Sequence, residues 1–164
     1  MKTNFTIRQA QQSDAVDLKE LFQNTVLVIN RRDYSQAEVE DWASCGNNLS
    51  NIKERIETHY FVVAVNQQSQ IVGFSSITPQ GYLHSMFVHK DFQGEGIATM
   101  LLEEIERYAI TAGITRITSE VSLTARLFFE KKGYIVEEEQ KRKANQLSLT
   151  NFWMVKQVIY PKSL

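Results

Sequence analysis

The sequence predicts one mixed α/β domain, and two observations support that prediction. Apolar residues change along the chain from helical spacing to continuous extended runs and back, so helices and strands are expected to alternate. The 164 residues contain only two prolines and no glycine- or serine-rich linker, so we expect a single domain over residues 1–164. A chain of this length buries about two-thirds of its unfolded surface, which is sufficient for one hydrophobic core.

The first third of the chain predicts a strand followed by three helices. Residues 5–8 form the expected strand, and Ser13 is placed as the N-cap of a helix with apolar residues at helical spacing. Ser35 with Glu38 three residues later matches a capping box that starts the second helix. Residues 51–58 predict the third helix.

The next segment predicts a β-hairpin and a further strand. Residues 60–65 are apolar throughout, residues 66–69 are polar and turn-like, and residues 71–77 form a second extended run. Gly81 then breaks the chain, and residues 82–89 predict the third strand in succession.

Residues 97–111 predict the clearest helix, because apolar residues recur there at a spacing of about 3.6. Gly113 is expected to end it. The remaining chain predicts a strand, a helix ended by Gly133 and two strands joined by a polar turn. They are placed at residues 114–121, 124–132, 134–141 and 147–158.

Composition excludes several classes of function. Lys and Arg total 18 against 19 Asp and Glu, and a net charge of -1 disfavours nucleic acid as the main partner. One cysteine excludes an internal disulfide, and three histidines without paired spacing predict no metal site. We find no signal-peptide pattern and no apolar run of the roughly 18–20 residues that span a bilayer. We therefore expect a cytoplasmic protein that binds no membrane.

A glycine-rich turn between a strand and the strongest helix is the segment that predicts chemistry. Gly94 and Gly96 lie in residues 93–98, where backbone N–H groups at a helix start face outward and favour a phosphate. A tight turn without a ligand is the alternative. The third glycine of dinucleotide sites and the Gly-Lys-Ser/Thr of triphosphate loops are both absent.

Two segments resemble the GNAT superfamily of acetyl-CoA-dependent N-acetyltransferases. Residues 88–102 resemble its main motif, with Gln93, Gly96 and Ala98 at the Gln/Arg-x-x-Gly-x-Gly/Ala positions. Residues 125–134 resemble its downstream Ala-x-x-Phe-Tyr-Glu-Lys-x-Gly-Phe segment. The resemblance implies a central, mostly antiparallel mixed sheet that is splayed at the acetyl-CoA site and flanked by helices.

The same resemblance implies where acetyl-CoA would bind. The pyrophosphate would lie on the glycine turn, on Gln93, Gly94, Glu95, Gly96, Ile97, Ala98 and Thr99. The pantetheine arm would pair with the preceding strand at Met86, Phe87 and Val88. Ser122 stands where the family often has an Asn, and Lys131, together with Arg126 and Lys132, is a candidate for the 3′-phosphate. Core packing of Met86 and Phe87, and solvated charges for the basic residues, are the alternatives.

The implied reaction is direct attack of a primary amine on the thioester. Backbone N–H groups around Phe87 and Val88 are the expected oxyanion donors. His84 is the first candidate base and Glu120 the second, with structural roles as the alternative for both. Phe129 stands where the family has a tyrosine general acid, so the thiolate would leave without a proton from that position.

Aromatic residues of the first helices are candidates for acceptor binding. Tyr34 and Trp42, together with His84, are expected at the acceptor pocket, although Trp42 is also a good core residue. Those two residues and residues 151–154 resemble an uncharacterised bacterial branch of the family. The sequence thus predicts an N-acetyltransferase for an amine of a small molecule or peptide. The closing strands are the candidate interface of a homodimer. A catalytically weak acyl-CoA-binding or sensing module is the alternative.

Overall fold

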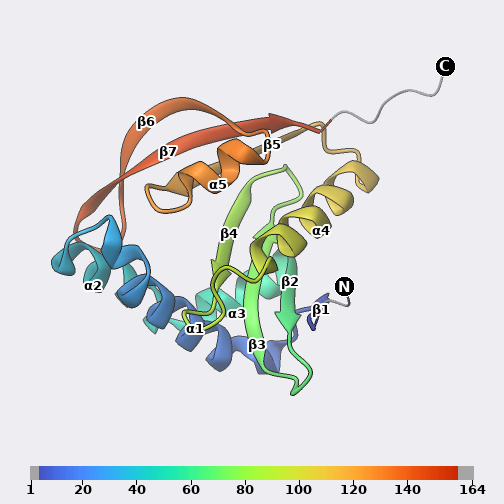
Figure 1. Ribbon diagram of the computed structural model, residues 1–164, viewed down its shortest axis with the longest axis horizontal. Coiled ribbons are helices and arrows are strands. Elements are labelled where there is room, and N and C mark those ends of the chain that lie inside the picture. Colours follow the sequence, from blue (N-terminus) through green and yellow to red (C-terminus); the bar gives the residue numbers. More distant parts are fainter. Residues whose placement is uncertain (1–3, 159–164) are drawn as a thin grey trace.

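The computed structural model describes residues 4–158, which form two antiparallel sheets with helices packed around them (Figure 1). The first sheet has the order β1-β2-β3-β4, with strands at Thr6–Gln9, Tyr60–Val65, Ile71–Ile77 and Leu83–Val88. The second has the order β5-β7-β6, with strands at Arg116–Ser122, Ser148–Gln157 and Ile135–Lys143. The helices are α1 (Ala15–Val28), α2 (Gln36–Ser44), α3 (Leu49–Thr58), α4 (Ile97–Thr111) and α5 (Arg126–Lys131). The predicted mixed α/β architecture is confirmed.

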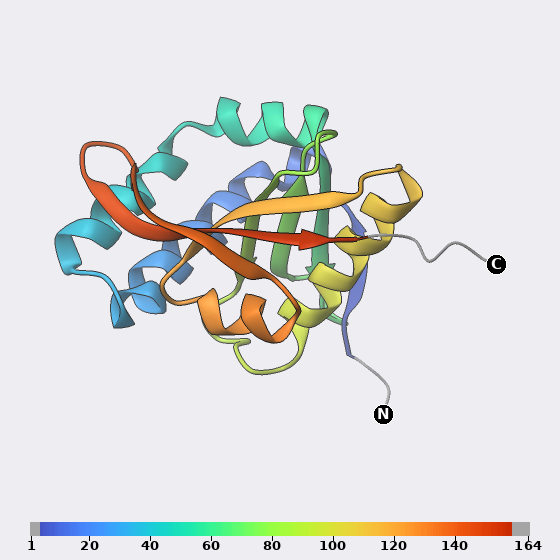
Figure 2. The same ribbon diagram turned by 90° about the horizontal axis from the view of Figure 1, so that it is seen from above.

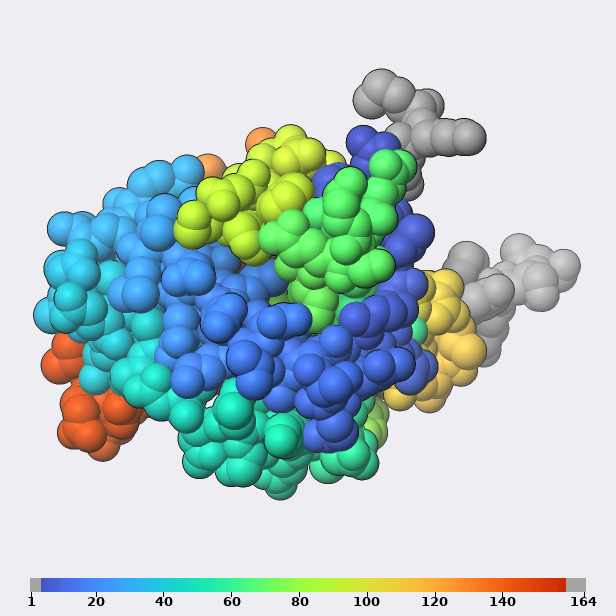
Figure 3. All heavy atoms as spheres, turned by 90° about the horizontal axis from the view of Figure 1, so that it is seen from below, coloured from blue at the N-terminus to red at the C-terminus, as the bar shows by residue number. Residues whose placement is uncertain are grey.

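Helices cover both faces of the first sheet, which explains the continuous apolar runs of β2 and β3. Side chains alternate between the two faces of a strand. In β2, Val62 and Ala64 pack in the core built on α4, whereas Phe61 and Val63 pack in the core built on α1 and α3. Figure 3 shows α1 and α3 as the outer surface of that second face. A strand buried on both faces has no polar alternation.

Gly73 lets α4 approach β3 closely. A Cβ atom at this position would lie 2.8 Å from Ile97 Cγ2 and 3.1 Å from Leu101 Cδ1. Ile97 is the first residue of α4. The contact therefore fixes where the helix begins relative to the first sheet, and with it the position of the glycine turn.

The two sheets meet at β4 and β5 and then separate. A parallel bridge joins Tyr82 to Thr118, and the Thr118 N–H donates to the Gly81 carbonyl at 3.0 Å. The Ser119 hydroxyl donates to the Leu83 carbonyl at 2.8 Å. Beyond this point no ladder pairs the strands within residues 4–158, so the edge of β4 toward Val88 is open.

Most predicted elements are confirmed to within a few residues, and α4 matches its predicted bounds. The Ser35–Glu38 capping box forms with hydrogen bonds of 3.1 and 2.9 Å. The prediction for Ser13 was wrong, because it lies inside a short 3-10 turn before α1. Asp14 organises that turn by accepting the Gln11 N–H at 2.7 Å and a two-point ion pair from Arg8.

Helix α5 is shorter than the predicted 124–132, because residues 122–125 form a separate turn. The Ala125 N–H donates to both the carbonyl and the hydroxyl oxygen of Ser122, at 3.2 and 3.1 Å. This turn places Ser122 and Thr124 beside the open edge of β4, where both line the cavity described next.

Candidate active site

The glycine turn presents unbonded N–H groups at the start of α4. Gly94 has φ +75° and Gly96 φ +82°, and a Cβ at either would meet nothing within 4 Å. In the described chain no backbone N–H of residues 93–99 donates to another protein group. The Gln93 side chain donates to the Val88 carbonyl at 2.7 Å and so ties the turn to the end of β4. Such a row of free donors at a helix N-terminus is suited to a phosphate group.

The register of β4 decides which backbone groups face the open edge. The His89 N–H donates to the Val72 carbonyl at 2.8 Å, and two residues earlier Phe87 pairs with Phe74. Because hydrogen-bonded pairs alternate in an antiparallel ladder, the N–H of Phe87 faces β3, while Met86 and Val88 face outward. The expectation that the Phe87 N–H faces the site is therefore corrected. Its ring instead packs on Phe22, with ring centroids 5.1 Å apart.

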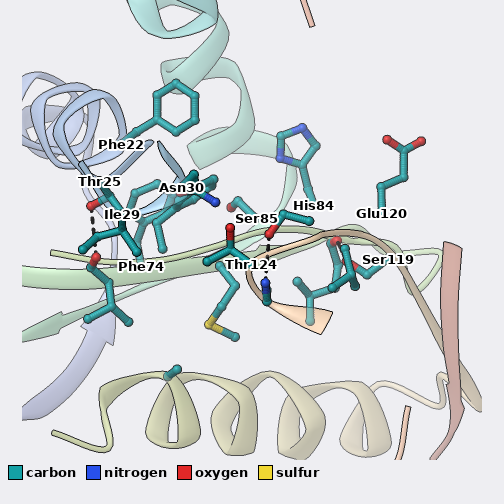
Figure 4. A pocket seen from close by; sticks show the side chains of 18 of the residues that line it. Phe22, Thr25, Ile29, Asn30, Phe74, His84, Ser85, Ser119, Glu120 and Thr124 are labelled. Atoms are coloured by element: carbon teal, nitrogen blue, oxygen red, sulfur yellow. Dashed lines mark hydrogen bonds between the residues drawn. The ribbon is translucent and has the colours of Figure 1, made fainter. Parts of the chain in front are cut away.

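A cavity of about 730 Å³ runs from the glycine turn past β4 to the side covered by α1 and α3. Figure 4 shows that His84, Glu120 and Phe22 lie on the side of the strands opposite to α4. The cavity thus has a donor end at the turn and an acceptor end beside α3. Its volume lies in the range of ligand-binding pockets.

His84 lies at the acceptor end because β4 contains a bulge. Ser76 pairs with Ser85 and Ile77 with Leu83, so His84 is the extra residue between the two pairs. A bulge redirects a side chain, and here the imidazole is exposed to the cavity, with no hydrogen bond to any described group. Desolvation and the nearby charges of Arg55 and His59 lower the pKa of His84 to about 4, so the ring is neutral at pH 7.

Glu120, the second candidate base, also lines the cavity but is already paired. Its carboxylate lies 3.4 Å from the Arg142 guanidinium on β6. Glu120 lies opposite Trp153 in the β5–β7 ladder, and Trp153 stacks on Tyr82. The Glu120 carboxylate therefore already has a partner on this chain, whereas the His84 ring has no hydrogen-bond partner among the described residues.

Tyr34 connects separate parts of the cavity wall. Its hydroxyl donates to the Thr150 carbonyl at 2.6 Å and accepts the Leu123 N–H at 2.9 Å. The side chain is 5% exposed, and desolvation raises its pKa to about 12. Trp42 packs against it at 5.7 Å between ring centroids. Both predicted acceptor residues line the cavity, but the Tyr34 hydroxyl has no capacity left to donate to a ligand.

The tip of the β6–β7 hairpin is held against α2, where it completes the acceptor end (Figure 2). The Asp41 carboxylate accepts the backbone N–H groups of Asn145, Gln146 and Leu147 at 2.9–3.0 Å. Partial desolvation acts to raise the pKa of Asp41, but these donors outweigh it and lower the pKa.

Phe129 stands at the position of the family's tyrosine, and its neighbour Tyr134 does not replace that tyrosine. Phe129 is 2% exposed, lines the cavity and packs edge-to-face on Tyr134 at 5.1 Å. The Tyr134 hydroxyl donates to Glu106 at 2.8 Å, and burial raises its pKa, so it supplies no proton to the cavity. Thr124 Oγ1 is buried beside this region without a partner in the described chain.

Two predicted cofactor residues do not line the cavity. Lys131 is exposed on α5, and Glu95 faces a separate shallow depression next to the β2–β3 turn. The neighbouring bases are engaged elsewhere, since Arg126 pairs with Glu130 at 3.0 Å and Lys132 lies over the Phe128 ring. The other predicted cofactor residues line the cavity, namely Met86, Phe87, Val88, Gln93, Gly94, Gly96, Ile97, Ala98, Thr99, Ser122 and Phe129.

Sequence reasoning missed many polar residues of the cavity, and Arg55, Arg142 and Thr124 are among them. For Arg55 a signal existed, because it lies on the same helical face as Ile52 and Ile56 and so interrupts an apolar stripe. No such signal marks Arg142 or Thr124. Among residues 4–158 no group of three His, Cys, Asp or Glu could hold a metal ion, and no helix is long and apolar enough to cross a membrane.

The two sheets separate beside a turn with free N–H groups, and the class of protein follows from its similarity to a known family. Residues 30–156 match the family described as the acetyltransferase (GNAT) domain, so the chain belongs to this family of acetyltransferases. It is 28% identical to the uncharacterised N-acetyltransferase YafP of Escherichia coli K12, over 92% of this chain and 95% of YafP.

Solved structures agree with this assignment. A GCN5-related N-acetyltransferase from Rhodopseudomonas palustris superposes with a TM-score of 0.90 at 27% identity, covering 96% of this chain and 97% of that one. The PaiA N-acetyltransferase of Thermoplasma acidophilum, solved in complex with coenzyme A, gives 0.79 at 20% identity, covering 96% and 99%. The predicted GNAT fold and the N-acetyltransferase class are confirmed.

Proposed function

We propose that this chain, as one domain over residues 1–164, transfers the acetyl group of acetyl-CoA to a primary amine by direct attack in a ternary complex. The observation that supports the proposal is the continuity of the free N–H groups of residues 93–99 with the open edge of β4. Acetyl-CoA supplies a thioester, whose C–S bond breaks as the C–N bond of the amide forms.

The residues present fit acetyl-CoA. Positive φ angles and open space at Gly94 and Gly96 leave room for a pyrophosphate against the turn. Met86 and the N–H of Val88 offer backbone groups to an extended arm, as an added strand would use them, whereas the Val88 carbonyl already accepts from Gln93 and Thr25. The unpartnered Thr124 hydroxyl and the Ser122 O–H lie on the opposite wall and suit the amides of that arm. The PaiA structure, which contains coenzyme A, has the same fold.

The chemistry assigned to this chain is limited to binding, polarisation and proton transfer. An N–H of Met86 or Val88 stabilises charge on the acetyl oxygen, because the ladder holds it in place before the reaction. His84 accepts the proton of the attacking amine, directly or through water, since its ring is neutral and open to the cavity.

The thiolate leaves without a proton from Phe129 in this mechanism. A thiol has a pKa of about 8.5, so leaving unprotonated at pH 7 costs at most about 2 kcal/mol. The same observation, with the engaged Tyr134 hydroxyl, favours the second candidate function, a slow or inactive acyl-CoA-binding module. Turnover with any amine distinguishes the two.

A matched pair of glycine variants tests the proposed acetyl-CoA site at the glycine turn. Gly94 and Gly113 both have positive φ and open space around a Cβ, but only Gly94 lines the cavity. Gly94→Ala and Gly113→Ala are each expected to lose about 1–2 kcal/mol of stability through backbone strain. Acetyl-CoA at 100 times Kd adds about 2.7 kcal/mol, or about 5–10 °C in Tm, to the wild type and to Gly113→Ala.

The Tm shift with acetyl-CoA is expected to be lost or strongly reduced in Gly94→Ala alone. No shift in the wild type, with ATP and NAD as comparison ligands, would contradict the proposal. Release of free thiol across a panel of amines then separates the transferase from the binding module.

A further inference from the structure

Arg55 is a half-buried cation in the cavity wall without a carboxylate partner. It lies on α3 beside Ile52 and faces the acceptor end. Five other arginines form ion pairs with acidic side chains: Arg8, Arg107, Arg116, Arg126 and Arg142. In the described chain no hydrogen bond or ion pair is formed by the Arg55 side chain, and desolvation lowers its pKa. A guanidinium removed from water is unfavourable unless an anion meets it.

The charge of the neighbouring Glu54 acts on Arg55, but no carboxylate among residues 4–158 forms an ion pair with it. The Arg55 charge acts on the two imidazoles of His59 and His84, whose ring centroids are 5.5 Å apart. Among the described residues that line the cavity, four are basic, namely Arg32, Arg55, Arg142 and Lys143. The single carboxylate in that wall belongs to Glu120, which Arg142 already pairs. The acceptor end is therefore positively charged.

An aromatic wall stands on the same side of the strands as Arg55. Phe22, Trp42 and Phe87 contact one another with centroids 5.1–6.4 Å apart, and Phe74 lies 5.5 Å from Phe87. These four rings line the cavity. An acceptor bound here meets an apolar surface in addition to a cation.

We propose that the acceptor is an amine that also bears a carboxylate, of the class of apolar and aromatic amino acids, and that Arg55 binds this carboxylate. Guanidinium and carboxylate match in a planar, two-point geometry. The aromatic wall takes the side chain, which leaves the amino group for His84 and the open edge of β4. This inference rests on the proposed function for the reaction, but the carboxylate site can be tested by binding alone.

A bound carboxylate also changes the electrostatics of the base. The Arg55 charge is one of the causes that hold the pKa of His84 low. A carboxylate beside Arg55 opposes that charge and raises the pKa of His84 toward its ordinary value. A polycationic amine such as spermidine would instead lower the pKa of His84 further. It would also be repelled by the basic residues of the cavity wall.

Matched acceptors with and without the carboxylate test the proposal. L-phenylalanine is compared with phenethylamine, and L-leucine with 3-methylbutylamine, by release of coenzyme A thiol. The wild type is expected to favour the amino acid in kcat/KM by about 10-fold to 100-fold, the range of a charged hydrogen-bonded contact. Arg55→Gln should abolish the preference and Arg55→Lys should reduce it. The control Arg116→Gln, which removes an exposed ion pair outside the cavity, should keep it.

Binding gives a readout that does not need turnover. With saturating coenzyme A, L-phenylalanine is expected to raise Tm of the wild type and of Arg116→Gln but not of Arg55→Gln, while phenethylamine raises none. A wild type that binds or uses both members of each pair equally, or a preference that persists in Arg55→Gln, would overturn the inference. Failure of acetyl-CoA to shift Tm instead removes the proposed function, and the Tm shift with L-phenylalanine without coenzyme A then decides the Arg55 site.

Discussion

Replacing Tyr34 by Phe should destabilise the protein by removing the partner of two partly buried backbone groups. The hydroxyl accepts the Leu123 N–H at 2.9 Å and donates to the Thr150 carbonyl at 2.6 Å, and the side chain is 5% exposed. A hydrogen bond contributes about 1 kcal/mol, and a buried group left without a partner costs about 1–3 kcal/mol. We therefore expect Tyr34→Phe to lose about 2–4 kcal/mol of unfolding free energy, or about 5–15 °C in Tm.

Urea unfolding at pH 7 measures this loss as a lower midpoint at unchanged m-value. Tyr108→Phe is the matched control, because it removes the same atom from a half-buried ring whose hydroxyl forms no hydrogen bond in the described chain. It should change stability by less than about 0.5 kcal/mol. A Tyr34→Phe variant as stable as this control would refute the view that the Tyr34 hydroxyl holds the cavity wall together.

Two further predictions concern His84 and Phe129. The pKa of His84 is about 4 in the folded protein against about 6.5 in an unfolded chain, so the unfolded state binds more protons between these values. The protein should therefore lose unfolding free energy as pH falls from 6.5 toward 4. Urea unfolding of His84→Gln should show a smaller loss over that range. An equal pH dependence of both proteins would contradict the lowered pKa of His84. Phe129→Tyr should raise kcat for thiol release by up to about 30-fold, the equivalent of about 2 kcal/mol, by supplying a proton to the thiolate. Phe128→Tyr, in the same wall, should give no gain, and an equal gain in both variants would argue against a specific acid at position 129.

Local signals predicted the elements well because they are complete within a few residues. Helix α4 was placed correctly, since its 3.6-residue apolar pattern lies between Gly96 and Gly113, both of which adopt positive φ. The Ser35 capping box needs only residues 35–38 and formed as expected. Ser13 was misplaced because Arg8 on β1 stabilises Asp14 instead, a contact that no helical pattern contains.

The acceptor end could not be predicted, because it depends on contacts far apart in the sequence. The orientation of His84 depends on the bulge in the pairing of β3 with β4. The hydroxyl of Tyr34 is used by residues 123 and 150, so a candidate ligand contact became a structural one. The donor end was easier to predict, since the glycine turn and the end of β4 are consecutive in the chain.

The place of β7 in the second sheet sets the order in which the protein can assemble. β7 follows β5 and β6 along the chain but lies between them, and β5 pairs with neither β6 nor, beyond one bridge, β4. During synthesis the four-stranded sheet and α4 can form first, whereas β5 and β6 have no partner strand until residues 148–157 arrive. A chain interrupted before residue 148 would lack the second sheet and the hairpin that Asp41 holds. It would also lack Phe152 and Met154, which share one core with the first turns of α4, so the glycine turn and the acceptor end both depend on the last strand.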